Sequence, residues 1–203
     1  MASSRAFSCM LLTLVACGEA EFDATPASAP EVRGPMDLEG RVVDPLALDG
    51  QPDLILFLRT DCPISNRYAP EIGRIAARFG EQVDVWLVYV DPDETPAIVR
   101  RHVADYALPG TPLLDPDQTL VARAGVEVTP EAALFDGEGQ RRYRGRIDDR
   151  QVAYGKARAQ PTTHELIDAL AALLAGQPPT IDHAPAIGCP LPRLPDAPRG
   201  APL

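Results

Sequence analysis

The sequence lacks any CxxC pair and holds only four cysteines, so a zinc ribbon and a dense disulfide scaffold are excluded. It also lacks an apolar run of the ~18 residues that a transmembrane helix needs. Its 19 basic residues are outnumbered by 29 acidic ones, and an acidic chain without a basic cluster is a poor candidate for binding nucleic acid. What is present, 45% apolar and 24% charged residues in a chain of 203, is typical of a globular domain.

The first 16 residues have the layout of a bacterial export signal. Arg5 provides the positive charge, and residues 6–16 are apolar over the length of a signal core. The letters LVAC, which end at Cys17, resemble the bacterial lipoprotein box, in which the signal is cleaved before a cysteine that then carries lipid. The resemblance implies a signal peptide over 1–16, lipidation at Cys17 and an extracytoplasmic protein held on a membrane by its lipid. Gly18 favours the outer membrane, and an ordinary signal peptide cleaved elsewhere is the alternative.

Two proline-rich stretches flank a central domain over residues 37–176. Residues 17–36 combine proline, alanine and acidic residues without periodicity, which is typical of a linker between an anchor and a domain. Residues 177–203 contain eight prolines. This composition predicts a disordered, extended tail that joins no sheet and carries Cys189.

Strand and helix patterns alternate through the central domain. Continuous apolar runs predict strands that are buried on both faces, and apolar residues at helical spacing follow them. Thr162 and Glu165 form a capping box at the start of the last helix. The order predicts an α/β fold with a mixed central sheet and helices on both faces. The expected strands are 54–58, 83–90, 113–114, 132–135 and 141–146, and the expected helices are 65–79, 94–106, 118–124 and 162–175.

Cys62 lies on the turn from the first buried strand to the first long helix. The carboxyl end of a parallel strand is where α/β folds place their chemistry. Exposed N–H groups at a helix N-terminus favour a thiolate, so we expect the pKa of Cys62 to lie below the ordinary ~8.5. Asp61 opposes this shift, because a carboxylate disfavours a second negative charge beside it. A buried structural cysteine is the alternative interpretation.

Four segments carry a family pattern: the strand-to-helix segment 57–65, Pro70 in the following helix, the strand end 88–91, and Pro130 within 128–131. Together they resemble the redoxin branch of the thioredoxin-like superfamily, which includes the alkyl-hydroperoxide-reductase/thiol-specific-antioxidant family and the membrane-tethered thiol-disulfide oxidoreductases of cytochrome c maturation. The motifs TDCPISNRYAPEI and YRGRIDD resemble a lipoprotein subgroup of redoxins. The resemblance implies a thioredoxin-like fold, Cys62 as a nucleophilic thiolate, and a cis peptide bond at Pro130 that presents backbone to a bound thiol.

The chain departs from this family at positions that decide its chemistry. Ser65 replaces the second cysteine of CxxC and Asp61 replaces the tryptophan before the first, so dithiol exchange within the loop is excluded. The peroxidase pattern PxxxTxxC also fails, although Thr60 places a hydroxyl group near the expected thiolate. The resemblance implies an extracytoplasmic thiol-disulfide oxidoreductase that acts on protein or small-molecule thiols and disulfides without a cofactor. A peroxiredoxin-like thiol peroxidase is the alternative enzyme.

Topology brings a charged loop toward the same end of the sheet. The predicted hairpin starts at the active end and returns there, so its connection 147–161 is expected near Cys62. Charged side chains in this loop would contact substrate, and a histidine at the following helix start would act as acid or base. A solvated loop with internal salt bridges and a surface histidine are the alternatives. The candidate substrate-contacting residues are Asp61, Ser65, Arg146, Asp148 and His164.

The role of Cys189 stays open between three possibilities. It is a resolving thiol that attacks a mixed disulfide on Cys62, a static disulfide partner of Cys62, or an unpaired thiol. The tail is long enough for Cys189 to return to the active end. A different class, a copper-handling or non-catalytic binding module, would use both cysteines with His102, His164 or His183. A metal site is not favoured, because the sequence has no close cysteine pair.

Overall fold

The structure is a computed structural model that describes residues 34–194. The expected signal peptide over 1–16, the lipidation site Cys17 and nearly all of the linker 17–36 lie outside the described residues, as do residues 195–203. Within residues 34–194, none of the helices combines the length and the apolar character that crossing a membrane requires.

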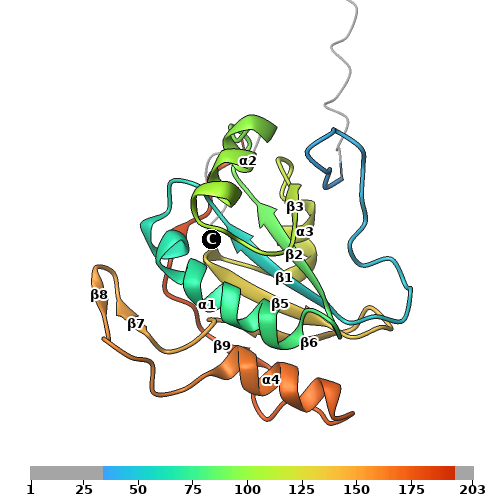
Figure 1. The fold of residues 1–203 in the computed structure, drawn as a ribbon, viewed down its shortest axis with the longest axis vertical. Helices are drawn as coiled ribbons and strands as arrows, with labels where there is room; N and C mark the ends of the chain where they lie inside the picture. The colour runs from blue at the N-terminus through green and yellow to red at the C-terminus, as the bar shows by residue number, and fades with distance from the viewer. Residues whose placement is uncertain (1–33, 195–203) are drawn as a thin grey trace, which may run out of the picture. The chain divides into compact units, whose positions relative to one another are not determined.

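A six-stranded mixed sheet forms the middle layer, in the order β3-β2-β1-β5-β6-β9 (Figure 1). β1 is parallel to β2, β2 to β3 and β6 to β9, whereas β5 is antiparallel to both β1 and β6. Two further pairs, β4 with β10 and β7 with β8, stand outside this sheet. The strands are β1 (Asp53–Leu58), β2 (Asp84–Tyr89), β3 (Thr111–Leu114), β4 (Val128–Thr129), β5 (Glu131–Phe135), β6 (Arg141–Gly145), β7 (Gln151–Ala153), β8 (Lys156–Ala157), β9 (His183–Ala184) and β10 (Cys189–Pro190).

The two faces of β1 are buried against different helices, because successive side chains of a strand alternate. Leu54 and Leu56 face an apolar cluster that includes residues of α1, α2 and α4. Ile55 and Phe57 face a second cluster that includes residues of α3. The predicted α/β fold with a mixed sheet and helices on both faces is therefore confirmed. The helices are α1 (Pro63–Phe79), α2 (Pro96–Asp105), α3 (Thr119–Ala124) and α4 (Glu165–Leu174).

The last helix begins later than the sequence predicts. His164 occupies the N-cap position of α4, and no side chain caps the first turn. Thr162 instead donates its hydroxyl and its backbone N–H to Asp149, so the capping box predicted for Thr162 and Glu165 is wrong. These hydrogen bonds, led by that of the Thr162 hydroxyl, lower the pKa of Asp149.

The tail forms more regular structure than its proline content predicts. β9 adds a strand to the main sheet beside β6, and β10 pairs with β4. Gly145 permits the close approach of β9, because a Cβ at Gly145 would lie 2.8 Å from the backbone nitrogen of Ala184. The expectation that the tail joins no sheet is therefore wrong for residues 183–184 and 189–190. Proline is compatible with this arrangement because both strands are only two residues long and lie at sheet edges.

A buried carboxyl group marks the beginning of β1. Asp53 is 5% exposed and accepts a hydrogen bond from the indole N–H of Trp86 at 2.8 Å. Burial raises the pKa of Asp53 to about 6, and the nearby carboxylate of Asp84 adds to the rise. Trp86 is the single tryptophan of the chain, so its fluorescence reports on this contact.

We expect Asp53→Asn to remove a pH-dependent loss of stability. The pKa of Asp53 is higher in the folded state than the ~3.9 of an unfolded chain, so the folded state binds more protons between pH 4 and 6. The free energy of unfolding therefore falls as the pH rises through this window, by about 1–3 kcal/mol from this group. Urea titrations followed by Trp86 fluorescence at pH 4.5 and 7 measure the change. An equal pH dependence in the wild type and Asp53→Asn would contradict the assignment.

Candidate functional site

Cys62 occupies the N-cap position of α1, directly after the turn that ends β1. Pro63 begins the helix, two residues before the expected start, and Cys62 is 1% exposed. The sulfur of Cys62 accepts a hydrogen bond from the backbone N–H of Ser65 at 3.5 Å and lies 3.2 Å from the carbonyl oxygen of Thr129. When Cys62 is reduced, the Ser65 N–H stabilises a thiolate, whereas the Thr129 carbonyl stabilises the protonated thiol.

Cys62 and Cys189 form a disulfide, with their Cα atoms 6.2 Å apart. β10 delivers Cys189 to this place by pairing antiparallel with β4, where Cys189 lies opposite Thr129. The Thr129–Pro130 peptide bond is cis, as the resemblance to redoxins implies. Of the three possibilities for Cys189, the structure has the disulfide with Cys62 and not the unpaired thiol, and a resolving and a static role both fit this pairing.

Thr60 is held by a network that the sequence analysis did not identify. Its backbone N–H donates to Glu94 at 2.6 Å, and its carbonyl oxygen accepts from the Asn66 side chain at 3.1 Å. The ring nitrogens of His102 lie 2.8 Å from the Asn66 amide oxygen and 2.9 Å from the Tyr89 hydroxyl. Burial raises the pKa of Glu94 and lowers that of His102.

Arg59 joins the acidic side chains of the turn to the tail. Its guanidinium group lies 2.9 Å from Asp61 and 3.1 Å from Asp91, and it donates to the carbonyl oxygen of Pro190 at 3.3 Å. The Asp61 side chain is 68% exposed. Because Arg59 and solvent compensate the charge of Asp61, the expected opposition of Asp61 to a Cys62 thiolate is weakened.

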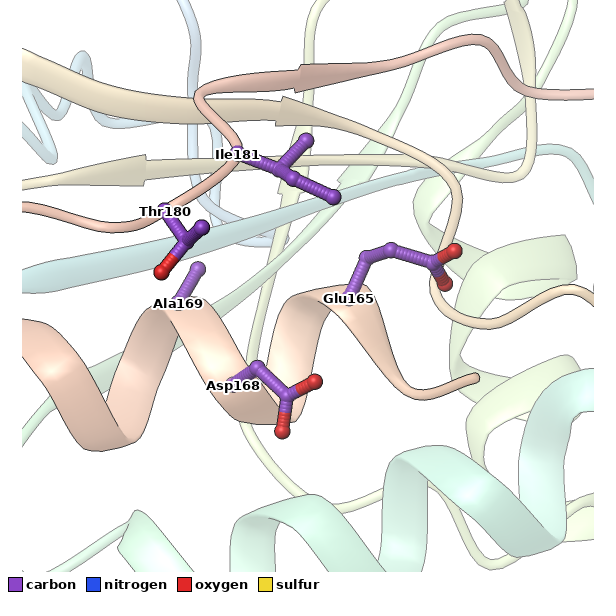
Figure 2. Close-up of a pocket in the computed structure, with 5 residues that line it drawn as sticks. All are labelled: Glu165, Asp168, Ala169, Thr180 and Ile181. Carbon is purple, nitrogen blue, oxygen red and sulfur yellow. The ribbon is translucent and has the colours of Figure 1, made fainter. Parts of the chain in front are cut away.

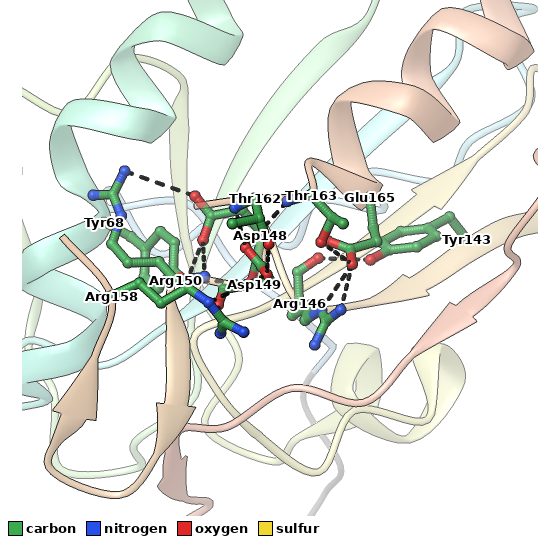
Figure 3. Close-up of polar contacts among 10 residues, drawn as sticks. All are labelled: Tyr68, Tyr143, Arg146, Asp148, Asp149, Arg150, Arg158, Thr162, Thr163 and Glu165. Carbon is green, nitrogen blue, oxygen red and sulfur yellow. Dashed lines mark hydrogen bonds and ion pairs between the residues drawn. The ribbon is translucent and has the colours of Figure 1, made fainter. Parts of the chain in front are cut away.

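Two of the expected substrate-contacting residues lie in a polar network around the loop after β6 (Figure 3). The Tyr68 hydroxyl donates to Asp148 at 2.6 Å, and the backbone N–H of Arg150 donates to the same carboxylate oxygen at 2.9 Å. Arg146 forms an ion pair with Glu165. Tyr68 lies on α1, the helix that follows Cys62. The network therefore ties this helix to the loop after β6.

The network does not bring these side chains onto the sulfur. Among residues 34–194, the polar contacts of the Cys62 sulfur are with Ser65 and Thr129, and none joins this sulfur to Arg146, Asp148 or His164. Their contact with a substrate therefore stays a prediction. In the structure, Asp148 joins this loop to Tyr68 of α1, whereas Arg146 pairs with Glu165 of α4.

His164 lines a separate pocket of about 560 Å³ together with Glu71, Arg74 and Arg150. One ligand atom each of Glu71, Asp148 and His164 lies within 4.8 Å of the others. Arg74 and Arg150 both form ion pairs with Glu71, and Arg150 also pairs with Asp148. These guanidinium groups compensate the carboxylates, so the cluster does not offer the net negative charge that attracts a cation.

A second pocket of about 300 Å³ lies between α4 and the segment that precedes β9 (Figure 2). Its wall includes Glu165 and Asp168, two acidic side chains of α4. Glu165 also forms the ion pair with Arg146 described above. The donor set of the copper alternative is not assembled in the part of the chain that the structure describes. Neither cysteine belongs there to a metal-ligand cluster with His102, His164 or His183.

Known proteins share this fold and part of this sequence. The chain is similar to the thiol-disulfide oxidoreductase ResA of Bacillus thuringiensis, with 27% identity over 104 residues. That match covers 51% of this chain and 60% of the relative, and a match of the same extent occurs with ResA of Bacillus anthracis.

Two solved structures resemble most of the chain. One is an uncharacterized conserved protein from Geobacillus kaustophilus, with a TM-score of 0.69 and 23% identity over 82% of this chain and 93% of its own. The other is a hypothetical protein from Sinorhizobium meliloti, with a TM-score of 0.66 and 24% identity over 77% of this chain and 87% of its own. At these identities the likeness concerns the fold. Residues 25–173 match the redoxin family. The mixed sheet, the cis-proline and the cysteine at the start of α1 agree with this match. The chain therefore belongs to the redoxin family.

Proposed function

We propose that the protein is an extracytoplasmic thiol-disulfide oxidoreductase in which Cys62 exchanges disulfides and Cys189 resolves the intermediate. The observation that carries the proposal is the disulfide between Cys62, at the start of α1, and Cys189, opposite the residue before Pro130. The similarity to a curated thiol-disulfide oxidoreductase supports the same chemistry. The substrates are thiols and disulfides of proteins or small molecules.

The exchange proceeds in two steps that conserve electrons. The Cys62 thiolate attacks one sulfur of a substrate disulfide, the substrate S–S bond breaks, and the first substrate thiol leaves with a proton. The Cys189 thiolate then attacks the Cys62 sulfur and releases the second substrate thiol. The substrate has gained two electrons, and Cys62 and Cys189 are left as the disulfide seen in the structure. The reverse sequence oxidises a dithiol substrate.

The remaining parts of the site position this chemistry. The Ser65 N–H stabilises the attacking thiolate, and a Cα separation of 6.2 Å lies within the range that a disulfide needs. The network of Glu94, Asn66 and His102 fixes the turn that carries Cys62. In this proposal Ser65 has no resolving role, because a hydroxyl group does not form a disulfide.

We expect Cys189→Ser to accumulate mixed disulfides on Cys62, because no second thiol then releases the substrate. Reduced protein is mixed with oxidised glutathione or a disulfide-containing polypeptide, quenched with acid, alkylated and analysed by mass spectrometry. The wild type should end as the Cys62–Cys189 disulfide, and Cys62→Ser should form no adduct at position 62. Peroxide consumption faster than that of Cys62→Ser would favour the peroxidase alternative. Equal adduct levels in the wild type and Cys189→Ser would contradict the resolving role.

We expect Cys17→Ser to abolish labelling of the protein by a radioactive or clickable fatty acid and to release the protein from the membrane fraction. The reason is that the acyl chains on Cys17 would be the anchor, because the sequence has no membrane-spanning run. Cys9→Ser is the matched control, since Cys9 lies inside the expected signal peptide. Undiminished labelling of Cys17→Ser would refute the anchor.

A further inference from the structure

The segment 188–192 lies against the site and contains the two-residue strand β10. Cys189 and Pro190 pair with β4. The carbonyl oxygen of Pro190 accepts from Arg59 at 3.3 Å, and that of Pro192 accepts from the Gln118 side chain at 2.8 Å. Any extended polypeptide can pair with a strand and offer carbonyl acceptors. These contacts therefore involve the main chain of the segment and do not depend on its side chains.

Two positions of the segment do carry a side-chain requirement. A Cβ on Gly188 would lie 2.7 Å from the carbonyl carbon of Thr129 and 3.3 Å from the nitrogen of Pro130, so only glycine fits before the cysteine without a shift of backbone. Leu191 packs against the apolar cluster on the α3 face of the sheet. Pro190, between them, is exposed. The surface that the segment covers therefore matches the pattern Gly-Cys-X-aliphatic.

We propose that residues 188–192 stand in for a substrate, and that reduced Cys62 takes extended polypeptides with the pattern Gly-Cys-X-aliphatic on this same surface. The tail and the substrate then compete for the edge of β4. The proposal rests on the proposed function, because it assigns the substrate class of the exchange at Cys62. It adds the residue types on both sides of the substrate cysteine, which the fit of Gly188 and Leu191 indicates.

In this proposal β10 leaves the edge of β4 and returns to it, while β9 stays in the main sheet. Upstream, β9 holds it to the sheet through hydrogen bonds of 2.9 Å from the Arg144 and Arg146 backbone N–H groups to Asp182 and Ala184. Residues 185–188 connect β9 to β10 without regular structure. Downstream, β10 is two residues long and joined to the domain by the disulfide. When the disulfide is reduced, only this short pairing and a few contacts retain the segment.

The exchange on this surface conserves atoms and electrons. The polypeptide cysteine enters as a disulfide with glutathione, the Cys62 thiolate attacks its sulfur, and glutathione leaves as the thiol. In the next step segment 188–192 returns to β4 and Cys189 attacks the Cys62 sulfur. The polypeptide leaves as a thiol, and β10 takes its place beside β4. No other oxidant or reductant takes part.

The test uses the full chain carrying Cys189→Ser, so that the tail does not close covalently. The probes are decapeptides with the sequence of residues 185–194, each bearing glutathione on its cysteine. One has the native sequence, one has alanine in place of the glycine before the cysteine, and one has aspartate in place of the leucine two residues after it. We expect the native peptide to form the mixed disulfide with Cys62 about tenfold faster than either variant. Equal rates for the three peptides would overturn the proposal.

Oxidised glutathione itself, without a peptide, measures the reactivity of Cys62 alone. If Cys62 reacts with neither glutathione disulfide nor any peptide, the proposed function fails. The substrate pattern then fails with it, whereas equal rates for the three peptides at a reactive Cys62 overturn the pattern alone.

Gly188→Ala in the otherwise native chain adds one methyl group where the backbone of Thr129 leaves no room. In a glutathione redox buffer we expect the equilibrium constant for closing the Cys62–Cys189 disulfide to fall about tenfold, as measured by alkylation and mass spectrometry. Gly73→Ala is the matched control, because a Cβ on Gly73 meets nothing within 4 Å. A closing equilibrium that is the same in Gly188→Ala, Gly73→Ala and the wild type would refute the glycine requirement.

Discussion

The antiparallel contact between β10 and β4 is the interaction on which the site depends. It sets Cys189 opposite Thr129 and beside the cis-proline, within disulfide distance of Cys62. It also covers the site, since Cys62 is 1% exposed and Cys189 is 6% exposed. The contact that allows the disulfide to form thus shields it from bulky thiols, so the strand must move before the site meets another polypeptide.

Contacts from the rest of the domain fix the position of Cys62. Glu94 and Asn66 hold the Thr60 backbone just before Cys62, and Tyr68 ties the first turns of α1 to Asp148. These groups come from α1, the loop before α2 and the loop after β6. A nucleophile fixed by such contacts loses little freedom in reaction, which favours exchange with an approaching disulfide. In the proposed exchange, a firmly held thiol therefore works together with a thiol on a strand of only two residues.

The fold and the place of Cys62 could be predicted from sequence because their signals are local. The apolar run of β1, the proline after Cys62 and the helical spacing of α1 each lie within a few residues. The strands of the tail carry no such signal, because two-residue strands rich in proline form by pairing with distant backbone. The same holds for His102 and Asn66, which lie 36 positions apart and meet only when α2 packs beside α1. The capping box failed because Asp149, 13 positions upstream of Thr162, competes for its hydrogen bonds.

The central claim is that Cys62 and Cys189 form one reversible redox couple on a domain that stays folded. The most direct measurement is a redox titration of the purified chain in dithiothreitol buffers, with alkylation and mass spectrometry reporting the cysteines and Trp86 fluorescence reporting the fold. The account predicts a single reversible two-electron transition, with both cysteines alkylated together at the reducing end and the fluorescence of a folded domain throughout. A disulfide that is reduced only when the domain unfolds would contradict it, and would make Cys189 a static structural partner.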